Sequence, residues 1–384
     1  KPWPHSLIRQ SLAPAAYLAV VTLSVLVAND VYLALFEVVL LLQAFLLFFY
    51  VVGTVRTRQD VLFIVSLLLV GLVLESLAMV GVRMIGHTAS FGPISVKVEG
   101  SRVGGTLGHP NMAGSYLGLL MALALGLMLT DSGSLYKWLA VAAFGLGGVA
   151  LLFTFSRGAW LAFAVSAIVF CLLAWHRSWL SLTVPAVLAL LVLMLALLYP
   201  DAILGRLFGV DGGAAQSRLP LMQLAHQIIR DHSLLGVGAN NFAQVVTDYI
   251  TPGFARVWIS TVHNKYLLVW SETGIVGLVT FVAFLLVTIR RGWQSYLKDD
   301  SLLSPLVLGL MAGLIGHMFH MSVDIFRHRP QVQLLWLIAG LIAAIRLMVD
   351  DEAQSKLISS SHKSETLPRA GMDSQELDTS RLRA

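Results

Sequence analysis

The stretch VYLALFEVVLLLQAFLLFFYVV, residues 31–52, decides the fold of this chain. Glu37 is the only charged side chain in it, and the stretch is long enough to cross the hydrocarbon core of a bilayer as a helix. Similar apolar runs recur along the 384 residues, of which 57% are hydrophobic and only 12% charged. The sequence therefore predicts a polytopic membrane protein.

Lipid-exposed backbone must satisfy its own hydrogen bonds, so every apolar run is expected to be helical. We predict an all-α, polytopic membrane helical bundle with ten spans, at 12–28, 31–52, 61–80, 111–130, 138–155, 159–175, 180–198, 266–289, 302–323 and 331–348. The chain begins at Lys1 without a methionine, so further residues are expected upstream. The single cysteine, Cys171, lies within a span and offers neither an internal disulfide nor a cysteine metal site.

Lysine and arginine in the short connections predict the orientation, because they favour the cytoplasmic side. Seven such residues fall on alternate connections and place both termini in the cytoplasm: Arg56, Arg58, Lys137, Arg177, Arg290, Arg291 and Lys298. The predicted domains are a transmembrane domain at 1–350, with an outer loop at 199–262 between spans seven and eight, and a disordered cytoplasmic tail at 351–384. The outer segments also carry many cations, which favours an anionic ligand on that side.

The outer loop at 199–262 contains helical patterns. Apolar residues recur at helical spacing from Ser217 to Ile228, and a second pattern runs from Asn240 or Asn241 to Tyr249. The intervening DHSLLGVGANN reads as a turn. Two amphipathic helices on the membrane surface would cover a cavity between spans, whereas the alternative is a solvated connector.

Three basic residues are the main candidates for chemistry. Arg157 stands between two closely spaced spans, where a charge needs a compensating partner or must extend to the lipid head groups. Arg218 begins the first amphipathic helix, and the alternative for it is an ordinary surface residue. His263 precedes a span, where an imidazole can accept a proton near neutral pH or serve a structural role.

Other polar residues surround these candidates. Asn264 can cap the span that follows or orient a neighbouring group. Lys265 adds positive charge, and Glu272 is expected to face protein. Asp324, followed by Arg327, is expected to orient a histidine or pair with an arginine. His317, His320 and Asp324 have a spacing that would permit metal binding, but the positive surroundings disfavour it. The glycine-rich GGTLGHPNMAG at 104–114 suits close backbone approach at a helix start and lacks the phosphate-loop pattern.

Three blocks taken together resemble the O-antigen ligase and polymerase superfamily of bacterial membrane glycosyltransferases. They are FTFSRGAW (153–160), SRLPLMQLAHQIIRDHSLLGVGANNF (217–242) and VHNKYLLVWSETGIVGL (262–278), and the resemblance extends over about 100–330. It implies a GT-C-like helical bundle in the inner membrane with its site in the periplasm. The usual count in that family is about twelve spans, so two would precede Lys1.

The resemblance also implies an activity: transfer of a glycan from undecaprenyl pyrophosphate to an acceptor sugar such as lipid A-core. By resemblance, Arg157 and Arg218 hold the pyrophosphate and His263 serves the acceptor hydroxyl, while Asn264, Lys265, Asp324 and Arg327 are assigned to substrate binding. No cofactor, metal, nucleotide or nucleic acid is expected, and the partners are the lipid-linked donor, the glycan acceptor and membrane lipids. The alternatives are a polysaccharide polymerase using the same donor, transfer to a protein, and a solute transporter.

Overall fold

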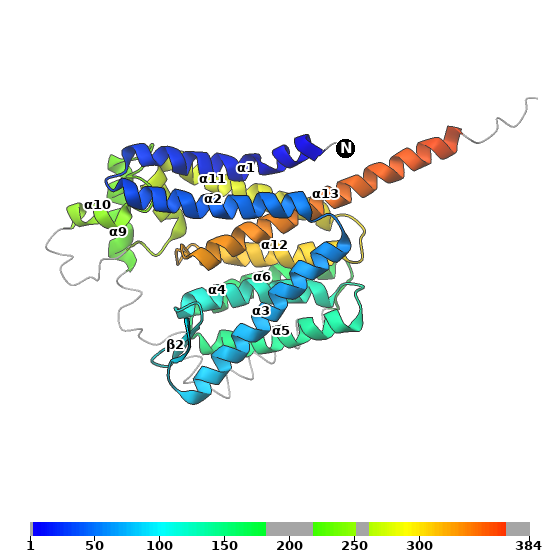
Figure 1. The fold of residues 1–384 in the computed structure, drawn as a ribbon, viewed down its shortest axis with the longest axis horizontal. Coiled ribbons are helices and arrows are strands. Elements are labelled where there is room, and N and C mark those ends of the chain that lie inside the picture. The colour runs from blue at the N-terminus through cyan, green and yellow to red at the C-terminus, as the bar shows by residue number, and fades with distance from the viewer. Residues whose placement is uncertain (1–2, 182–217, 251–260, 366–384) are drawn as a thin grey trace, which may run out of the picture.

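The computed structural model describes residues 3–181, 218–250 and 261–365. Within these ranges the chain is a bundle of helices with one small sheet (Figure 1). The long helices are α1 (Trp3–Leu23), α2 (Val31–Thr54), α3 (Arg58–Ile85), α4 (Pro110–Met128), α5 (Ser134–Phe153), α6 (Arg157–His176), α9 (Arg218–Asp231), α11 (Lys265–Tyr296), α12 (Leu303–His320) and α13 (Arg329–Glu365). The short elements are η1 (Ser24–Val27), β1 (Ala89–Phe91), β2 (Ile94–Glu99), β3 (Arg102–Gly105), α10 (Phe242–Val245) and η2 (Val246–Tyr249).

Nine helices in the described ranges are long and apolar enough to cross a membrane. They match nine of the ten predicted spans, and the prediction of a multi-pass helical bundle is confirmed. The other predicted span, at 180–198, lies almost entirely outside the described residues. α13 continues to Glu365, past the predicted boundary at 350, because the polar residues that follow include good helix formers. The remainder of the predicted tail, 366–384, lies outside the described residues.

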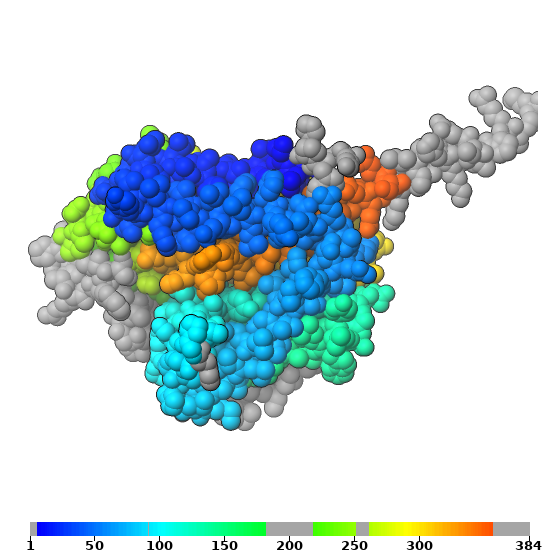
Figure 2. Space-filling model, viewed as in Figure 1, coloured from blue at the N-terminus to red at the C-terminus, as the bar shows by residue number. Residues whose placement is uncertain are grey.

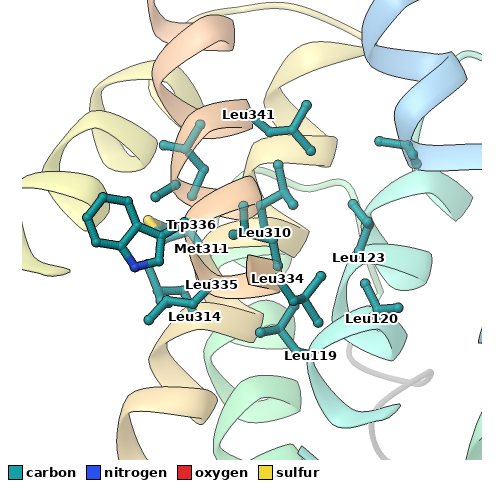
Figure 3. Close-up of a cluster of buried hydrophobic side chains, with 14 of the residues drawn as sticks. Leu119, Leu120, Leu123, Leu310, Met311, Leu314, Leu334, Leu335, Trp336 and Leu341 are labelled. Carbon is teal, nitrogen blue, oxygen red and sulfur yellow. The ribbon is translucent and has the colours of Figure 1, made fainter. Parts of the chain in front are cut away.

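The centre of the bundle is formed by α4, α12 and α13. α12 packs against α4 and α6, and α13 packs against α2. Figure 3 shows the buried side chains that these helices share: Leu119, Leu120, Leu123, Leu310, Met311, Leu314, Leu334, Leu335, Trp336 and Leu341. The peripheral helices, among them α2 on the outer face of the molecule (Figure 2), instead expose large apolar side chains such as Phe36 and Leu46, as expected of helices that face lipid.

Small residues allow α4 and α12 to approach closely. A Cβ atom on Gly309 would lie 2.6 Å from the carbonyl oxygen of Ala122, and one on Gly313 would lie 2.8 Å from that of Leu119. Lipid is as apolar as the side chains, so close van der Waals packing between small residues holds such helices together. This packing fixes the end of α12, which leads directly to Asp324.

A three-stranded antiparallel sheet, in the order β1-β2-β3, occupies much of the connection between the spans predicted at 61–80 and 111–130. Val96 and Val103 bury their side chains beneath it. Glu75 of α3 binds the residue that follows β3. Its carboxylate accepts hydrogen bonds from the backbone nitrogen of Thr106 (2.9 Å) and from the Thr106 hydroxyl (2.6 Å). The sheet places Arg102 and the start of α4 over one end of the bundle.

The two ends of the bundle differ in charge and in structure. At one end, Arg58 pairs with Asp300 (2.5 Å) and Glu352 (3.0 Å), and Arg177 donates to the carbonyl of Lys298 (3.0 Å). We call this the basic end, comprising the connections at 55–57, 129–133 and 297–302. The loop end is the opposite one, where the sheet, α9 and α10 lie (Figure 1). All predicted site residues belong to elements that begin or end there.

The helices predicted in the loop at 199–262 are confirmed where the structure describes them, as α9 and as α10 with η2. α9 buries Leu221, Leu224 and Ile228 on one face and packs against α11. The turn between α9 and α10 enters a break in α11 at Gly274, whose φ is 68°. Gly238 donates its backbone N–H to the carbonyl of Glu272 there (2.9 Å).

The same turn also contacts the connection between α1 and α2. Asn241 accepts a hydrogen bond from the backbone nitrogen of Asp30 (2.6 Å) and donates one to its carbonyl (3.1 Å). The buried carboxylate of Glu272 accepts from the backbone nitrogen of Phe242 (3.3 Å). Glu272 therefore faces protein, as predicted, and anchors the loop end.

Replacing Gly274 with alanine should destabilise the folded protein by roughly 1–3 kcal/mol. The new Cβ would overlap the carbonyl of Leu234, and the positive φ is unfavourable for any residue with a side chain. The measurement is the thermal unfolding midpoint of the purified protein in detergent. Gly145→Ala is the matched control, because a Cβ at Gly145 meets no atom within 4 Å. Equal midpoints for the two variants would contradict the prediction.

Candidate functional site

The start of α11 is fastened to the chain that follows α12. The backbone nitrogen of Lys265 donates to the carbonyl of Met321 (2.8 Å). Asn264 donates from its side chain to the carbonyl of Ser322 (2.9 Å) and caps α11 by accepting from the backbone nitrogen of Leu267 (3.0 Å). These bonds bring His263 next to Asp324, which is 61 residues further along the chain (324 minus 263).

His263 and Asp324 form a close pair. The distance between His263 Nδ1 and Asp324 Oδ1 is 3.5 Å. The carboxylate is buried, with 9% of its side chain exposed, whereas the histidine side chain is 36% exposed. The contact is electrostatic, because Nδ1 of His263 makes no hydrogen bond among the described residues. A carboxylate facing one ring nitrogen favours this orientation of the imidazole and leaves Nε2 for proton transfer.

Asp324 is held from two further directions. Its Oδ2 accepts from the side-chain nitrogen of Asn111 (2.7 Å), and its Oδ1 accepts from the backbone nitrogen of Ile325 (2.8 Å). Burial by itself would raise the pKa of Asp324, but the interaction with His263 and the backbone donor outweigh it and hold the pKa below its ordinary value. The carboxylate therefore stays ionised at neutral pH.

Asn111 connects Asp324 to other elements. Its side-chain oxygen accepts from the hydroxyl of Ser156 (2.9 Å) and from Arg102 Nη2 (2.8 Å). Asn111 lies in the first turn of α4, Ser156 caps α6, and Arg102 begins β3. We call Arg102, Asn111, Ser156, His263 and Asp324 the Asp324 network.

His109 lies beside this network as the residue that caps α4. It is close enough to interact electrostatically with Asp324, His263 and Arg102. Burial lowers the pKa of His109 more than the nearby carboxylates of Glu99 and Asp324 raise it. A neutral imidazole at this position adds a hydrogen-bonding group to the site without adding a charge.

The two predicted phosphate-binding arginines begin helices that reach the same place. Gly158, next to Arg157, lies against His320, where an added Cβ would be 2.9 Å from the imidazole Nε2. Arg218 is close enough to His320 to interact with it electrostatically. The backbone nitrogen of Asp324 in turn donates to the carbonyl of His320 (3.0 Å). The start of α6 thus packs against the last turn of α12, one turn from Asp324, and the start of α9 lies within electrostatic range of the same turn.

The remaining predicted residues have protein partners at the loop end. Arg327 donates to the side-chain oxygen of Asn240 (3.3 Å), and Lys265 interacts electrostatically with Glu272. His317 bonds through Nδ1 to the hydroxyl of Ser115 (2.8 Å). Among the residues that the structure describes, no three His, Cys, Asp or Glu side chains are grouped to hold a metal ion.

Sequence reasoning did not identify Asn111, Ser156, Arg102 or His109 as members of the site. The glycine-rich GGTLGHPNMAG contained the signal for His109 and Asn111, but the sequence indicated only a helix start there. Arg102 counted as one outer cation among many. The contact between Ser156 and Asn111 joins positions 45 apart in the chain, and that between Asn111 and Asp324 joins positions 213 apart.

Replacing Asp324 with asparagine should lower stability at pH 7 by about 1.5–3 kcal/mol, the usual contribution of hydrogen bonds to a buried charged group. The folded pKa lies below the unfolded value, so the carboxylate stabilises the protein above the unfolded pKa near 3.9. That stabilisation is lost as the pH falls towards the lower folded value. The difference between the thermal midpoints of wild type and variant, measured in detergent, should be largest at pH 7 and should shrink as the pH falls below about 4. A difference that does not change with pH would contradict this account.

Part of the chain resembles a known protein family. Residues 140–282 match the model of the family described as Wzy_C, O-antigen ligase. The matched range contains Arg157, Arg218, His263, Asn264 and Lys265, whereas Asp324 and Arg327 lie beyond it. The resemblance predicted from the sequence is confirmed over this range.

One solved structure also resembles the chain. It is described as "Structural coordination of polymerization and crosslinking by a peptidoglycan synthase complex". The matching chain is 16% identical with a TM-score of 0.49, and the match covers 91% of this chain and 98% of that one. No curated protein is significantly similar to this chain.

Proposed function

We propose that this protein is a membrane glycosyltransferase that moves a glycan from undecaprenyl pyrophosphate to an acceptor sugar, with lipid A-core as the acceptor. The observation that carries the proposal is the His263–Asp324 pair, which lies at the same end of the bundle as the starts of α6 and α9. The match of residues 140–282 to the O-antigen ligase family supports the same reaction class.

The proposed reaction is a single displacement. The acceptor hydroxyl oxygen attacks the anomeric carbon of the donor, and its proton passes to Nε2 of His263. The bond between the anomeric carbon and the pyrophosphate oxygen breaks, and undecaprenyl pyrophosphate leaves with the electron pair. A sugar hydroxyl is a poor nucleophile, so a positioned base accelerates the step by about a hundred- to ten-thousandfold.

Arg157 and Arg218 are proposed to bind the pyrophosphate. A guanidinium donates paired hydrogen bonds to phosphate oxygens, and it stabilises the charge that develops on the leaving group. Asn264, Lys265, Asp324 and Arg327 are proposed to line the substrate path, with Asp324 acting through His263. In this scheme the arginines neutralise the phosphates, so the reaction requires neither a metal ion nor a nucleotide.

The proposed setting is the bacterial inner membrane, with the basic end in the cytoplasm and the loop end in the periplasm. The lysines and arginines of the basic end support this orientation. In this arrangement residues 1–350 form the transmembrane domain, 199–262 its periplasmic loop and 351–384 a cytoplasmic tail. The transporter alternative loses support, because two of its candidate intramembrane carboxylates have structural partners. Glu75 binds the backbone nitrogen of Thr106, and Glu272 binds that of Phe242.

The decisive experiment incubates the purified protein with an undecaprenyl-pyrophosphate glycan, with and without lipid A-core. A product that forms only when lipid A-core is present supports ligation. A ladder of longer lipid-linked glycans without lipid A-core would instead establish the polymerase alternative, which uses the same donor. Absence of transfer to either acceptor, from protein that is folded and correctly inserted, would refute the proposal.

A further inference from the structure

A large cavity lies at the basic end, far from the Asp324 network. Its volume is about 1090 Å³, and it is bounded by the first half of α1, the last turns of α11 and the distal part of α13. α11 packs against both α1 and α13. Figure 1 shows the distal part of α13 extending beyond the bundle near the N-terminal end of α1. The cavity occupies the wedge between these helices.

The lining of this cavity is rich in arginine. It contains four arginines against two aspartates: Arg9, Arg290, Arg291, Arg346, Asp350 and Asp351. Arg346 already pairs with Asp350 at 2.6 Å. The formal charge of these six side chains is +2 (four positive minus two negative), and it is concentrated on the side formed by α1 and α11.

Arg291 is a buried and incompletely bonded cation in this lining. Only 9% of this residue is exposed. Its Nη1 atom is buried without a hydrogen-bond partner in the part of the chain that the structure describes, and its Nη2 atom makes one long bond, to the carbonyl of Arg9 (3.4 Å). Burying a guanidinium without a counter-ion is costly, so the structure has a strong requirement for a negative group at this point.

The depth of the cavity matches that of lipid head groups. Arg291 lies five residues before the end of α11, which corresponds to about 7.5 Å along the helix axis. Basic pockets between transmembrane helices at this depth suit the phosphates of anionic lipids. Gln10 lines the same cavity, and its side-chain oxygen is a buried acceptor without a partner in the described ranges. A glycerol hydroxyl of a lipid head group would satisfy that acceptor.

We propose that this cavity binds the head group of an anionic phospholipid that carries glycerol, either phosphatidylglycerol or cardiolipin. Arg9 and Arg291 hold the phosphate, and Gln10 accepts a hydrogen bond from the glycerol hydroxyl. The site lies at the opposite end of the bundle from the proposed chemistry and does not depend on it. Its role is to fasten α1 to α11 and α13 at that leaflet.

Native mass spectrometry of the full chain in detergent tests this proposal, with phosphatidylglycerol as the probe and phosphatidylethanolamine as the zwitterionic control. Wild type should retain one phosphatidylglycerol in preference to phosphatidylethanolamine. Arg9→Gln combined with Arg291→Gln should weaken retention by at least about tenfold, the equivalent of one charge-assisted hydrogen bond. The matched control is Lys137→Gln, an exposed cation at the same end but outside the cavity, and it should bind like wild type.

Arg9 is exposed, so Arg9→Gln alone provides the test if the double variant does not fold, with a loss of about tenfold expected. Equal retention of the two lipids by wild type, or unchanged retention in the Arg9 variants, would overturn the proposal. Inorganic phosphate is the second probe. If phosphate raises the thermal midpoint of wild type as much as phosphatidylglycerol does, the site takes a free phosphate and the assignment to a lipid is wrong.

Discussion

His263→Ala is expected to lower the rate of glycan transfer by about a hundred- to ten-thousandfold, the usual contribution of a positioned general base. His263 has one ring nitrogen facing the buried carboxylate of Asp324 and a side chain that remains partly exposed. Alanine removes the proton acceptor but leaves Asp324 bonded to Asn111 and Ile325. Donor binding should change little, so the loss should fall on kcat rather than on KM for the donor.

The measurement is the initial rate of transfer by purified protein in proteoliposomes, with folding checked by size-exclusion profile and thermal midpoint. His226→Ala is the matched control. His226 is an exposed histidine of α9 at the same end of the bundle, and its ring bonds the carbonyl of Met222 within its own helix (2.7 Å). A His263→Ala variant with the activity of the His226→Ala control would remove the general base from the proposed mechanism.

Arg218→Ala is expected to lower kcat/KM for the donor by about a hundred- to thousandfold, comparable to removing one donor from an electrostatic stabilising site. The arginine begins α9, close to His320 and the last turn of α12. Its proposed ligand, the pyrophosphate, gains charge as the glycosidic bond breaks. Arg218→Lys should recover only part of the activity, because an ammonium group cannot offer two parallel hydrogen bonds.

Arg230→Ala is the control for this experiment. Arg230 is an exposed arginine in the last turn of the same helix, so its removal changes the charge of α9 without touching the site. Transfer kinetics at several donor concentrations separate a binding defect from a chemical one. If Arg218→Ala keeps the donor kinetics of Arg230→Ala, then Arg218 has no part in phosphate binding.

The sequence predicted the spans because a helix in lipid must be long and apolar, whatever its neighbours are. It also predicted α9, since Leu221, Leu224 and Ile228 recur on one face. The sheet at 89–105 was missed, because its strands are short and are stabilised by contacts such as that between Glu75 and Thr106. The break in α11 was missed for a similar reason: a glycine within an apolar run does not reveal the turn that packs against it.

The candidate site could be predicted only in part. Asp324 was expected to orient a histidine or pair with an arginine, and the structure places it 3.5 Å from His263. The role of Asn111 was not predictable, because its amide joins an early loop to a late one. The carboxylate of Glu272 was expected to face protein, but its partner at Phe242 follows only from the fold. Local patterns indicate which side chains are available, and tertiary contacts decide which of them work together.

The Asp324 network also has a consequence for how the protein is made. Asn111 and Asp324 are separated by 213 positions, and His263 is translated well before its carboxylate partner. A nascent chain that has emerged only as far as residue 300 possesses the imidazole but lacks the group that orients it. The proposed general base therefore becomes oriented only after α12 and Asp324 have been synthesised.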